Sequence, residues 1–242
     1  MKHYLLLAAL AVAAPLHLNA KPAVPTIEQL AAFPALSSLS VSPDGSQIAG
    51  LQARGEERVI LVWKTADLSA APTTIGAGRM KFQSVRFIKN GLLAVTLWQP
   101  YDLRTDRVNK TFISKFYITD TEGKQWKEPI SIPRATSRSE ELEQALSNPS
   151  VLDTLPNDPD HILVINGAGS NSGDVYKVNL RSFTSQRIQK TEERVAGYLT
   201  DLNSELRARL RQDVDSVGAY VSTEFRNPAT NAWEEHFRSH VK

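Results

Sequence analysis

A glycine-rich stretch, Gly167–Gly173, is the first place in this chain where residue types and spacing could do chemistry. A nucleophile elbow needs the pattern G-x-S-x-G followed by a helix, but Asn171 occupies the position of the serine. The same glycines could cradle a phosphate if a helix began directly after them. The alternating apolar residues of 175–180 predict a strand instead. We therefore interpret the stretch as a hairpin loop in which glycine permits a sharp reversal of the chain.

The histidines are the next candidates, because His236 and His240 have the spacing of a zinc site on a helix. The segment 233–238 is predicted as a strand, on which the two side chains would lie about 13 Å apart at roughly 3.3 Å per residue. That separation is too large for one metal ion. His161, at the exit of a predicted turn, has no evident partner, and the chain has no cysteine. The sequence therefore predicts no metal site, disulfide or thiol nucleophile.

Three arginines, Arg207, Arg209 and Arg211, alternate along another predicted strand and would share one of its faces. Such a row could receive a carboxylate or a phosphate. A solvated face or cross-strand ion pairing is the more common use of this pattern. These patterns assign no catalytic residue and imply no cofactor.

Composition limits the classes of partner that the chain can have. Of its 242 residues, 41% are hydrophobic and 22% are charged, as in ordinary globular proteins. Lys2 is the only charged residue among the first 20, so the remainder has 27 basic residues, one fewer than the total of 28, against 26 acidic ones. This near balance gives no global attraction to nucleic acid or to an anionic membrane.

The first 20 residues have the pattern of a secretory signal peptide. A short basic start is followed by the apolar run 5–16, and Ala20 supplies the small residue that a signal peptidase needs. A membrane anchor is the alternative, but this run is too short to cross about 30 Å of hydrocarbon. We expect a periplasmic or secreted protein that begins at Lys21 and has no membrane attachment after cleavage.

The elements that follow repeat one pattern: an apolar strand, a tight turn with acidic or amide residues, and a second apolar strand. The clearest copies are 39–50, 85–95 and 151–164, and a more diverged one starts near Val195. The corresponding turn positions, spaced 46, 68 and 45 residues apart, are Asp44, Asn90, Asp158 and Asn203. An inserted helix accounts for the longer middle spacing. A repeat of about 40–50 residues is typical of propeller blades.

The sequence therefore predicts an all-β fold, a partial or small β-propeller of about four four-stranded antiparallel blades. The predicted blades span 39–80, 81–135, 150–190 and 195–242. Residues 21–38 are predicted to form a lead-in segment, with a short helix over 25–34. Residues 136–149 are predicted to form a helical insertion, because Ser137 and Glu140 have capping-box spacing. The polar stretch 99–110 is predicted to be a loop.

Three segments carry a resemblance to a known family: the lead-in 25–34, the turn Ser42-Pro-Asp-Gly45 and the hairpin 198–209. In this order they resemble the N-terminal half of prolyl-oligopeptidase-family serine peptidases. The similarity is to their bacterial exported dipeptidyl-aminopeptidase and acylaminoacyl-peptidase-like branch, and it covers essentially all of residues 21–242. In that family a β-propeller caps an α/β-hydrolase domain, whose Ser/Asp/His triad cleaves short peptides. None of the triad positions has a counterpart in this chain.

The resemblance implies that this chain is the propeller portion of such a peptidase, inactive alone, which controls the access of peptides to a hydrolase domain that the chain lacks. Its partners would be a peptide substrate or that domain. Related aminopeptidases hold the free amine of the substrate with acidic residues of a propeller insertion, so the resemblance suggests this role for Glu140 and Glu141. Acidic residues in the first turn of a helix also favour its macrodipole without any ligand.

A second hypothesis from another class is a stand-alone periplasmic propeller that binds a protein or a peptide. It predicts a closed, monomeric domain with no hydrolase sequence downstream. The DNA beyond codon 242 would distinguish the two hypotheses.

Overall fold

The computed structural model describes residues 27, 34–102, 110–131, 135–167 and 173–241. The chain divides into two compact units, residues 1–33 and 34–242, and Ile27 is the one described residue of the first. The predicted signal peptide, nearly all of the lead-in helix and residues 168–172 of the glycine-rich loop therefore lie outside the described residues. Within the described ranges, no helix has the length and apolar character needed to cross a bilayer.

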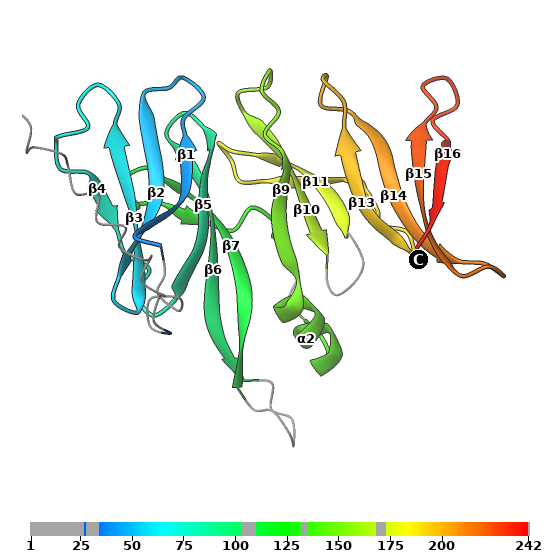
Figure 1. Ribbon diagram of the computed structural model, residues 1–242, viewed down its shortest axis with the longest axis horizontal. Coiled ribbons are helices and arrows are strands. Elements are labelled where there is room, and N and C mark those ends of the chain that lie inside the picture. Colours follow the sequence, from blue (N-terminus) through cyan, green and yellow to red (C-terminus); the bar gives the residue numbers. More distant parts are fainter. Residues whose placement is uncertain (1–26, 28–33, 103–109, 132–134, 168–172, 242) are drawn as a thin grey trace, which may run out of the picture. The chain divides into compact units, whose positions relative to one another are not determined.

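The second unit consists of four sheets that follow one another along the chain (Figure 1), and each contains four antiparallel strands. The first sheet contains β1 (Leu36–Val41), β2 (Gln47–Arg54), β3 (Glu57–Lys64) and β4 (Thr73–Ile75). The second contains β5 (Lys81–Lys89), β6 (Leu92–Asp102), β7 (Lys110–Asp120) and β8 (Trp126–Lys127). The third contains β9 (Asn148–Asp153), β10 (His161–Gly167), β11 (Asp174–Asn179) and β12 (Ser185–Gln189). The fourth contains β13 (Val195–Thr200), β14 (Leu206–Val214), β15 (Ala219–Arg226) and β16 (Trp233–His240).

Each sheet is a simple meander, because strands adjacent in sequence are also adjacent in the sheet. The prediction of four four-stranded antiparallel blades is therefore confirmed. The four predicted turn residues each lie between the first and second strands of a sheet. Gly45 (φ 72°) and Gly91 (φ 73°) supply the positive backbone angle that the first two of these turns require.

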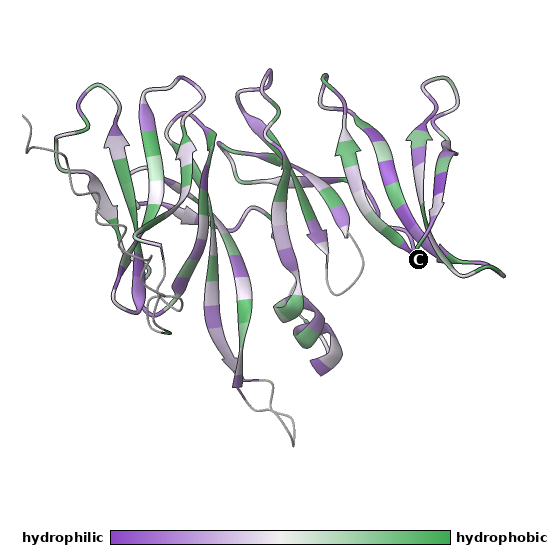
Figure 2. Ribbon diagram, viewed as in Figure 1, coloured by the Kyte–Doolittle hydropathy of each residue, from purple (hydrophilic) through white to green (hydrophobic). Residues whose placement is uncertain are grey.

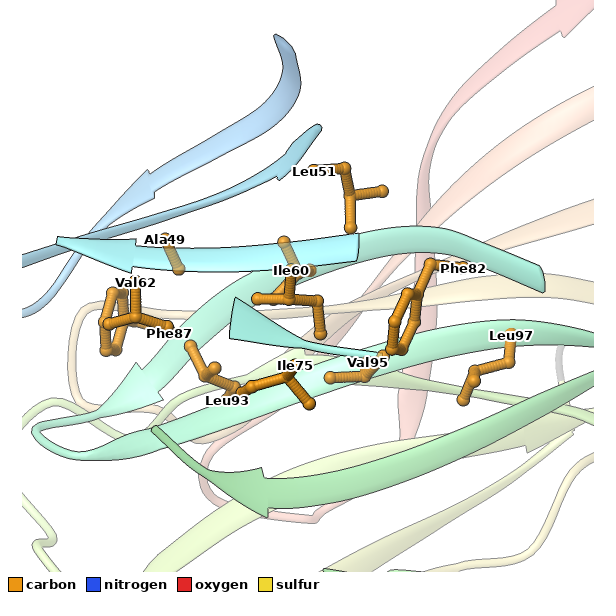
Figure 3. Close-up of a cluster of buried hydrophobic side chains, with 11 residues drawn as sticks. Ala49, Leu51, Ile60, Val62, Ile75, Phe82, Phe87, Leu93, Val95 and Leu97 are labelled. Atoms are coloured by element: carbon orange, nitrogen blue, oxygen red, sulfur yellow. The ribbon is translucent and has the colours of Figure 1, made fainter. Parts of the chain in front are cut away.

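Three apolar clusters join the sheets in sequence order. The first lies between sheets one and two and contains Leu51, Ile60, Phe82 and Val95, all essentially inaccessible to solvent (Figure 3). Apolar residues alternate with polar ones along many of the strands, which gives these strands an apolar face to bury (Figure 2). Burial of each large side chain contributes about 1.5–3 kcal/mol. Each sheet thus depends on its neighbours for cover.

The second and third clusters continue this packing. One joins the second and third sheets around Ile118 and Val164, and the other joins the third and fourth around Leu163 and Tyr198. Among the described buried residues, no cluster joins the fourth sheet to the first. The fold is therefore propeller-like, but these four sheets do not close it.

Polar contacts reinforce the same junctions near the first turn of each sheet. The backbone N–H of Asp44 donates to Asn90 Oδ1 at 3.0 Å, which links the first two sheets. The hydroxyl of Thr200 donates to Asp153 Oδ2 at 2.6 Å, which links the last two. Equivalent turns of successive repeats are thus joined by side chains that belong to the repeat itself.

Three predicted boundaries are wrong. The stretch 99–110 is not all loop, because β6 continues to Asp102 and β7 begins at Lys110. Beyond Trp98, β6 has a partner on one side only, where proline at position 100 is tolerated. Residues 148–149, assigned to the insertion, open β9, and β1 begins at Leu36, inside the predicted lead-in.

Candidate functional site

The predicted inserted helix is present as α2 (Arg138–Leu146), and it carries the two candidate glutamates in its first turn. Ser137 is the N-cap residue, and its hydroxyl accepts a hydrogen bond from the N–H of Glu140 at 3.2 Å. This contact satisfies one of the free N–H groups at the start of the helix. Ala145 is the buried residue of α2, and the helix packs against β7 of the second sheet. The helix therefore lies beside the β6–β7 hairpin (Figure 1).

Glu140 uses its carboxylate to complete the start of the helix. Its Oε2 accepts hydrogen bonds from the backbone N–H of Thr136 at 2.7 Å and from the Thr136 hydroxyl at 2.8 Å. These two hydrogen bonds lower the pKa of Glu140 below its usual value. In a capping box, the side chain of the third helical residue accepts a hydrogen bond from the backbone N–H of the N-cap residue. Glu140 makes the same kind of contact, but with the residue before the N-cap. Glu140 therefore has a structural role at this position.

Glu141 faces the hairpin instead. Its Oε2 forms an ion pair with Arg138 Nη1 at 2.8 Å, and its Oε1 accepts a long hydrogen bond from the hydroxyl of Tyr101 at 3.5 Å. Arg138 also donates to this hydroxyl at 3.4 Å, and these contacts raise the pKa of Arg138. The side chains of Arg138 and Glu141 are about half exposed, at 43% and 53%. An ion pair this exposed contributes little to stability.

A cavity of about 500 Å³ lies at the far end of the hairpin, next to this cluster. Tyr101 lines it and is shared with the Glu141 cluster, and Phe112 from β7 forms another wall. The ring of Phe112 lies 6.2 Å from that of Trp98, and both residues remain substantially exposed, at 53% and 43%. Aromatic side chains left in solvent beside a cavity are typical of binding surfaces.

This arrangement can hold an apolar group against Phe112 and place a positive charge near the carboxylate of Glu141. Tyr101 was not predicted as a site residue, because it lies in a polar stretch that was predicted to be a loop. Trp98, Pro100 and Phe112 alternate with polar residues in this part of the sequence, a pattern that favours a pair of strands and could have indicated that Tyr101 is held in place. Among the described residues, no group of three or more histidines and acidic residues could hold a metal ion.

The histidines have separate roles in the structure. His236 packs edge-on against Phe225, and His240 Nε2 lies 3.1 Å from Asp215 Oδ2. They do not form a common site. His161, for which no partner was predicted, contacts the carboxylate of Asp158 through Nδ1 at 2.9 Å and the amide of Asn179 at 3.2 Å. It therefore stabilises a turn of the third sheet.

The three alternating arginines of β14 form ion pairs, as the more common use of the pattern predicted. Arg209 is the most buried, at 5% exposure, and it forms ion pairs with Glu224 directly across on β15 and with Glu192 at 2.7 Å. Arg207 pairs with Asp201 at 2.8 Å. Arg211 lies 3.6 Å from Asp213. These acidic partners satisfy the row of arginines.

Known proteins match this chain in their structure, but not in their sequence. No protein-family model matches the chain, and neither does any curated protein sequence. A solved puromycin-hydrolysing peptidase from Mycobacterium tuberculosis superposes with a TM-score of 0.50 at 16% identity, over 83% of this chain and 31% of that one. An acylaminoacyl peptidase complex and the acylaminoacyl peptidase of Pyrococcus horikoshii superpose with TM-scores of 0.48 and 0.43, at 14% and 13% identity. They match 79% and 81% of this chain, and 31% and 36% of theirs.

These structural neighbours are prolyl-oligopeptidase-family peptidases, and the superposition on the puromycin-hydrolysing peptidase shows that the chain has the fold of a propeller portion. The chain spans about a third of their length. The resemblance stated from the sequence is therefore confirmed at the level of the fold.

Proposed function

We propose that this chain is the N-terminal propeller portion of an exported prolyl-oligopeptidase-like serine peptidase, in which it controls the access of peptides to a catalytic α/β-hydrolase domain. The observation that carries the proposal is the superposition on 31% of a puromycin-hydrolysing peptidase at a TM-score of 0.50. A part that covers a third of a peptidase and consists of sheets is suited to shape an entrance. Such a part leaves the chemistry to the remainder of the protein.

The second element of the proposal is that Glu141 receives the free amine of a peptide. Its carboxylate forms an exposed ion pair with Arg138. The net stabilisation from this ion pair is small enough for the ammonium group of a ligand to compete with Arg138 for the carboxylate. The cavity lined by Tyr101 and Phe112 would then hold the first side chain of the peptide. Glu140, which the family resemblance also suggested, would act indirectly by keeping the start of the helix in place through Thr136.

Export is the third element, and it rests on the sequence of residues 1–20. An apolar run of this length after a basic start, with a small residue before Lys21, is what signal peptidase recognises. The balance of acidic and basic residues in the remainder gives no reason for attachment to a membrane surface.

The test of the main proposal is the natural polypeptide. An antibody raised against residues 34–241 should detect, in the periplasmic or secreted fraction, a protein longer than 242 residues. That protein should react with a fluorophosphonate probe, whereas the purified chain of 242 residues should not. An unlabelled natural product of only this length would refute the proposal and support the stand-alone binding propeller.

The amine site has its own test. Peptides with a free N-terminus should bind the purified chain about tenfold more tightly than their N-acetylated forms, because a charge-assisted contact is lost. Glu141→Gln should abolish this preference. Glu140→Gln is the matched control and should keep it while lowering the melting temperature. Equal binding of free and acetylated peptides to the unaltered chain would remove the amine site from the proposal.

A further inference from the structure

A second cavity, of about 380 Å³, lies between the third and fourth sheets, away from α2. Its volume falls in the range of about 300–1,000 Å³ that small-molecule sites occupy. Strands β10, β11 and β12 contribute to one side of the cavity, and β14, β15 and two turns of the fourth sheet contribute to the other. None of the residues that the proposed function uses lines this cavity.

Part of the lining is apolar and comes from the core. Leu155, Leu163 and Leu206 line the cavity and are only 6%, 2% and 6% exposed. Ile188 of the edge strand β12 also lines it and remains 41% exposed. A preformed apolar surface of this kind can accept an aliphatic side chain without rearrangement.

Three cationic side chains line the cavity, and two of them are neutralised by neighbouring carboxylates. Lys177 lies 3.1 Å from Asp158 Oδ2. Arg207 pairs with Asp201 at 2.8 Å and with Glu205 at 2.6 Å. These two cations therefore add little net charge to the cavity.

The third cation, Arg226, is different. Its guanidinium forms no hydrogen bond or ion pair with any other described residue, and its Nε is buried without a partner. It is held by the ring of Trp233, whose centroid lies 5.5 Å from Cζ of Arg226. Arg209 stacks on the same ring at 4.7 Å, but its charge is matched by Glu192 and Glu224. Arg226 is thus the uncompensated positive charge of this cavity.

A buried donor with no partner is unfavourable by about 1–3 kcal/mol and calls for an explanation. A guanidinium matches the geometry of a carboxylate, which it can bind through two parallel hydrogen bonds. A single uncompensated charge suits a monoanion better than a phosphate dianion. The apolar lining beside it suits an aliphatic group on the same ligand.

The backbone at the cavity gives an independent indication. Ser204, in the turn between β13 and β14, lines the cavity with φ at 63°, a conformation that is unfavourable for a residue with a side chain. Asn231, in the turn between β15 and β16, also lines it with φ at 63°, which asparagine tolerates better. Backbone strain of this kind is concentrated at ligand-binding sites.

We propose that this cavity binds the carboxylate of a small aliphatic acid, either a free amino acid or the C-terminal residue of a peptide. The carboxylate pairs with the guanidinium of Arg226, and the aliphatic side chain lies on Leu155, Leu163 and Leu206. Ile188 forms the outer edge of the site.

The first experiment is calorimetric titration of the full chain with N-acetyl-leucine. N-acetyl-leucine amide, which lacks the charge, should bind at least about tenfold more weakly, as expected for the loss of a charge-assisted hydrogen bond. Inorganic phosphate should compete poorly. Any of three results would overturn the proposal: equal affinity for the acid and the amide, tighter binding of phosphate than of the acid, or no binding of the acid at about 10 mM.

Variants locate the site. Arg226→Gln should weaken binding of N-acetyl-leucine by about tenfold or more, and Arg226→Lys should weaken it less, because the charge is retained without the planar fork. Arg54→Gln is the matched control, since Arg54 is an exposed arginine on the first sheet, and it should change nothing. Unchanged binding to Arg226→Gln would overturn the proposal.

A second variant covers the case in which Arg226→Gln does not fold. Ile188→Glu places a negative charge at the exposed edge of the cavity and leaves Arg226 in place, so the fold should persist while the carboxylate is repelled. Loss of binding with an unchanged melting temperature supports the site, and retained binding overturns it. Free leucine and glycyl-leucine distinguish the two sources: leucine binds equally well if the ligand is an amino acid, and only the dipeptide binds if it is a peptide end.

Discussion

Replacement of Lys89 by methionine should remove a polar contact of three hydrogen bonds between the second and third sheets. Lys89 is the last residue of β5, and its ammonium donates to the backbone carbonyls of Thr154 at 2.6 Å, Leu155 at 2.8 Å and Asp158 at 2.6 Å. All three donors of the ammonium are thereby used. Burial lowers the pKa of Lys89, although the nearby carboxylates of the third sheet act in the opposite direction. The group therefore depends on the three carbonyls in place of water.

The magnitude follows from these contacts. A hydrogen bond to a charged group contributes about 1.5–3 kcal/mol, so three independent ones would give about 4.5–9 kcal/mol. They share one ammonium and are not additive, and water can reach the carbonyls in the variant because Lys89 is only partly buried. We expect Lys89→Met to lower the free energy of unfolding by about 2–4 kcal/mol. For a chain of this size, that corresponds to a fall in melting temperature of roughly 5–15 °C.

The assay is urea unfolding followed by tryptophan fluorescence at neutral pH. Lys64→Met is the matched control, because Lys64 is an exposed lysine at the end of β3, and its replacement should stay within about 0.5 kcal/mol of the unaltered chain. Lys89→Arg should give an intermediate loss, since a planar fork cannot reach three carbonyls arranged around a point charge. A change below about 0.5 kcal/mol for Lys89→Met would refute the reasoning.

Three further predictions concern single sites. Burial raises the pKa of Asp158, but hydrogen bonds from a histidine and a lysine lower it by more, so the net pKa lies below its usual value. The stability that this carboxylate contributes should therefore be lost progressively as pH falls below about 4. In acid titrations followed by circular dichroism, the stability of Asp158→Asn should approach that of the unaltered chain in this range, and a constant difference would contradict the prediction. Gly173→Ala should leave the chain unfolded, or lower its free energy of unfolding by at least about 3 kcal/mol, because the added Cβ would lie 1.9 Å from a backbone carbonyl oxygen. Gly91→Ala has open space around the added Cβ and should lower it by about 1–2 kcal/mol. Calorimetry measures both losses, and similar values would be inconsistent with the geometry. Arg209→Met should destabilise the chain by about 3 kcal/mol in urea, because the nearly buried Glu224 would keep only the longer contact with Arg211, at 3.7 Å. The double change with Glu224→Leu should recover part of that loss.

The blade pattern could be predicted from the sequence because turns make local demands on particular residues. Gly45 and Gly91 both have φ above 70°, which few other residues adopt easily, and each is preceded by a residue suited to the turn. The inserted helix was also predictable, since Ser137 lies where a cap must be. Local chemistry fixed these elements, so tertiary contacts changed only their boundaries.

The candidate site was less predictable, because its members come from distant parts of the chain. Glu140 and Glu141 are adjacent and chemically identical, yet one caps the helix and the other faces Tyr101. Tyr101 precedes Glu141 by 40 residues. The strand that positions it passes through Pro100, a residue that ordinarily ends a strand. The extension is stable as a two-stranded ribbon supported by the diagonal contact between Trp98 and Phe112.

The two arginines on Trp233 show how charge pairing separates a structural residue from a candidate binding residue. Arg209 and Arg226 stack on the same ring, at 4.7 and 5.5 Å, and both have a buried guanidinium nitrogen. Arg209 belongs to the conspicuous alternating row of β14, but Glu192 and Glu224 match its charge, so a ligand anion would have to displace two carboxylates. Arg226 belongs to no motif and has no anionic partner among the described residues. A ligand carboxylate would therefore be drawn to the arginine that the sequence pattern does not mark, because binding there displaces no existing ion pair.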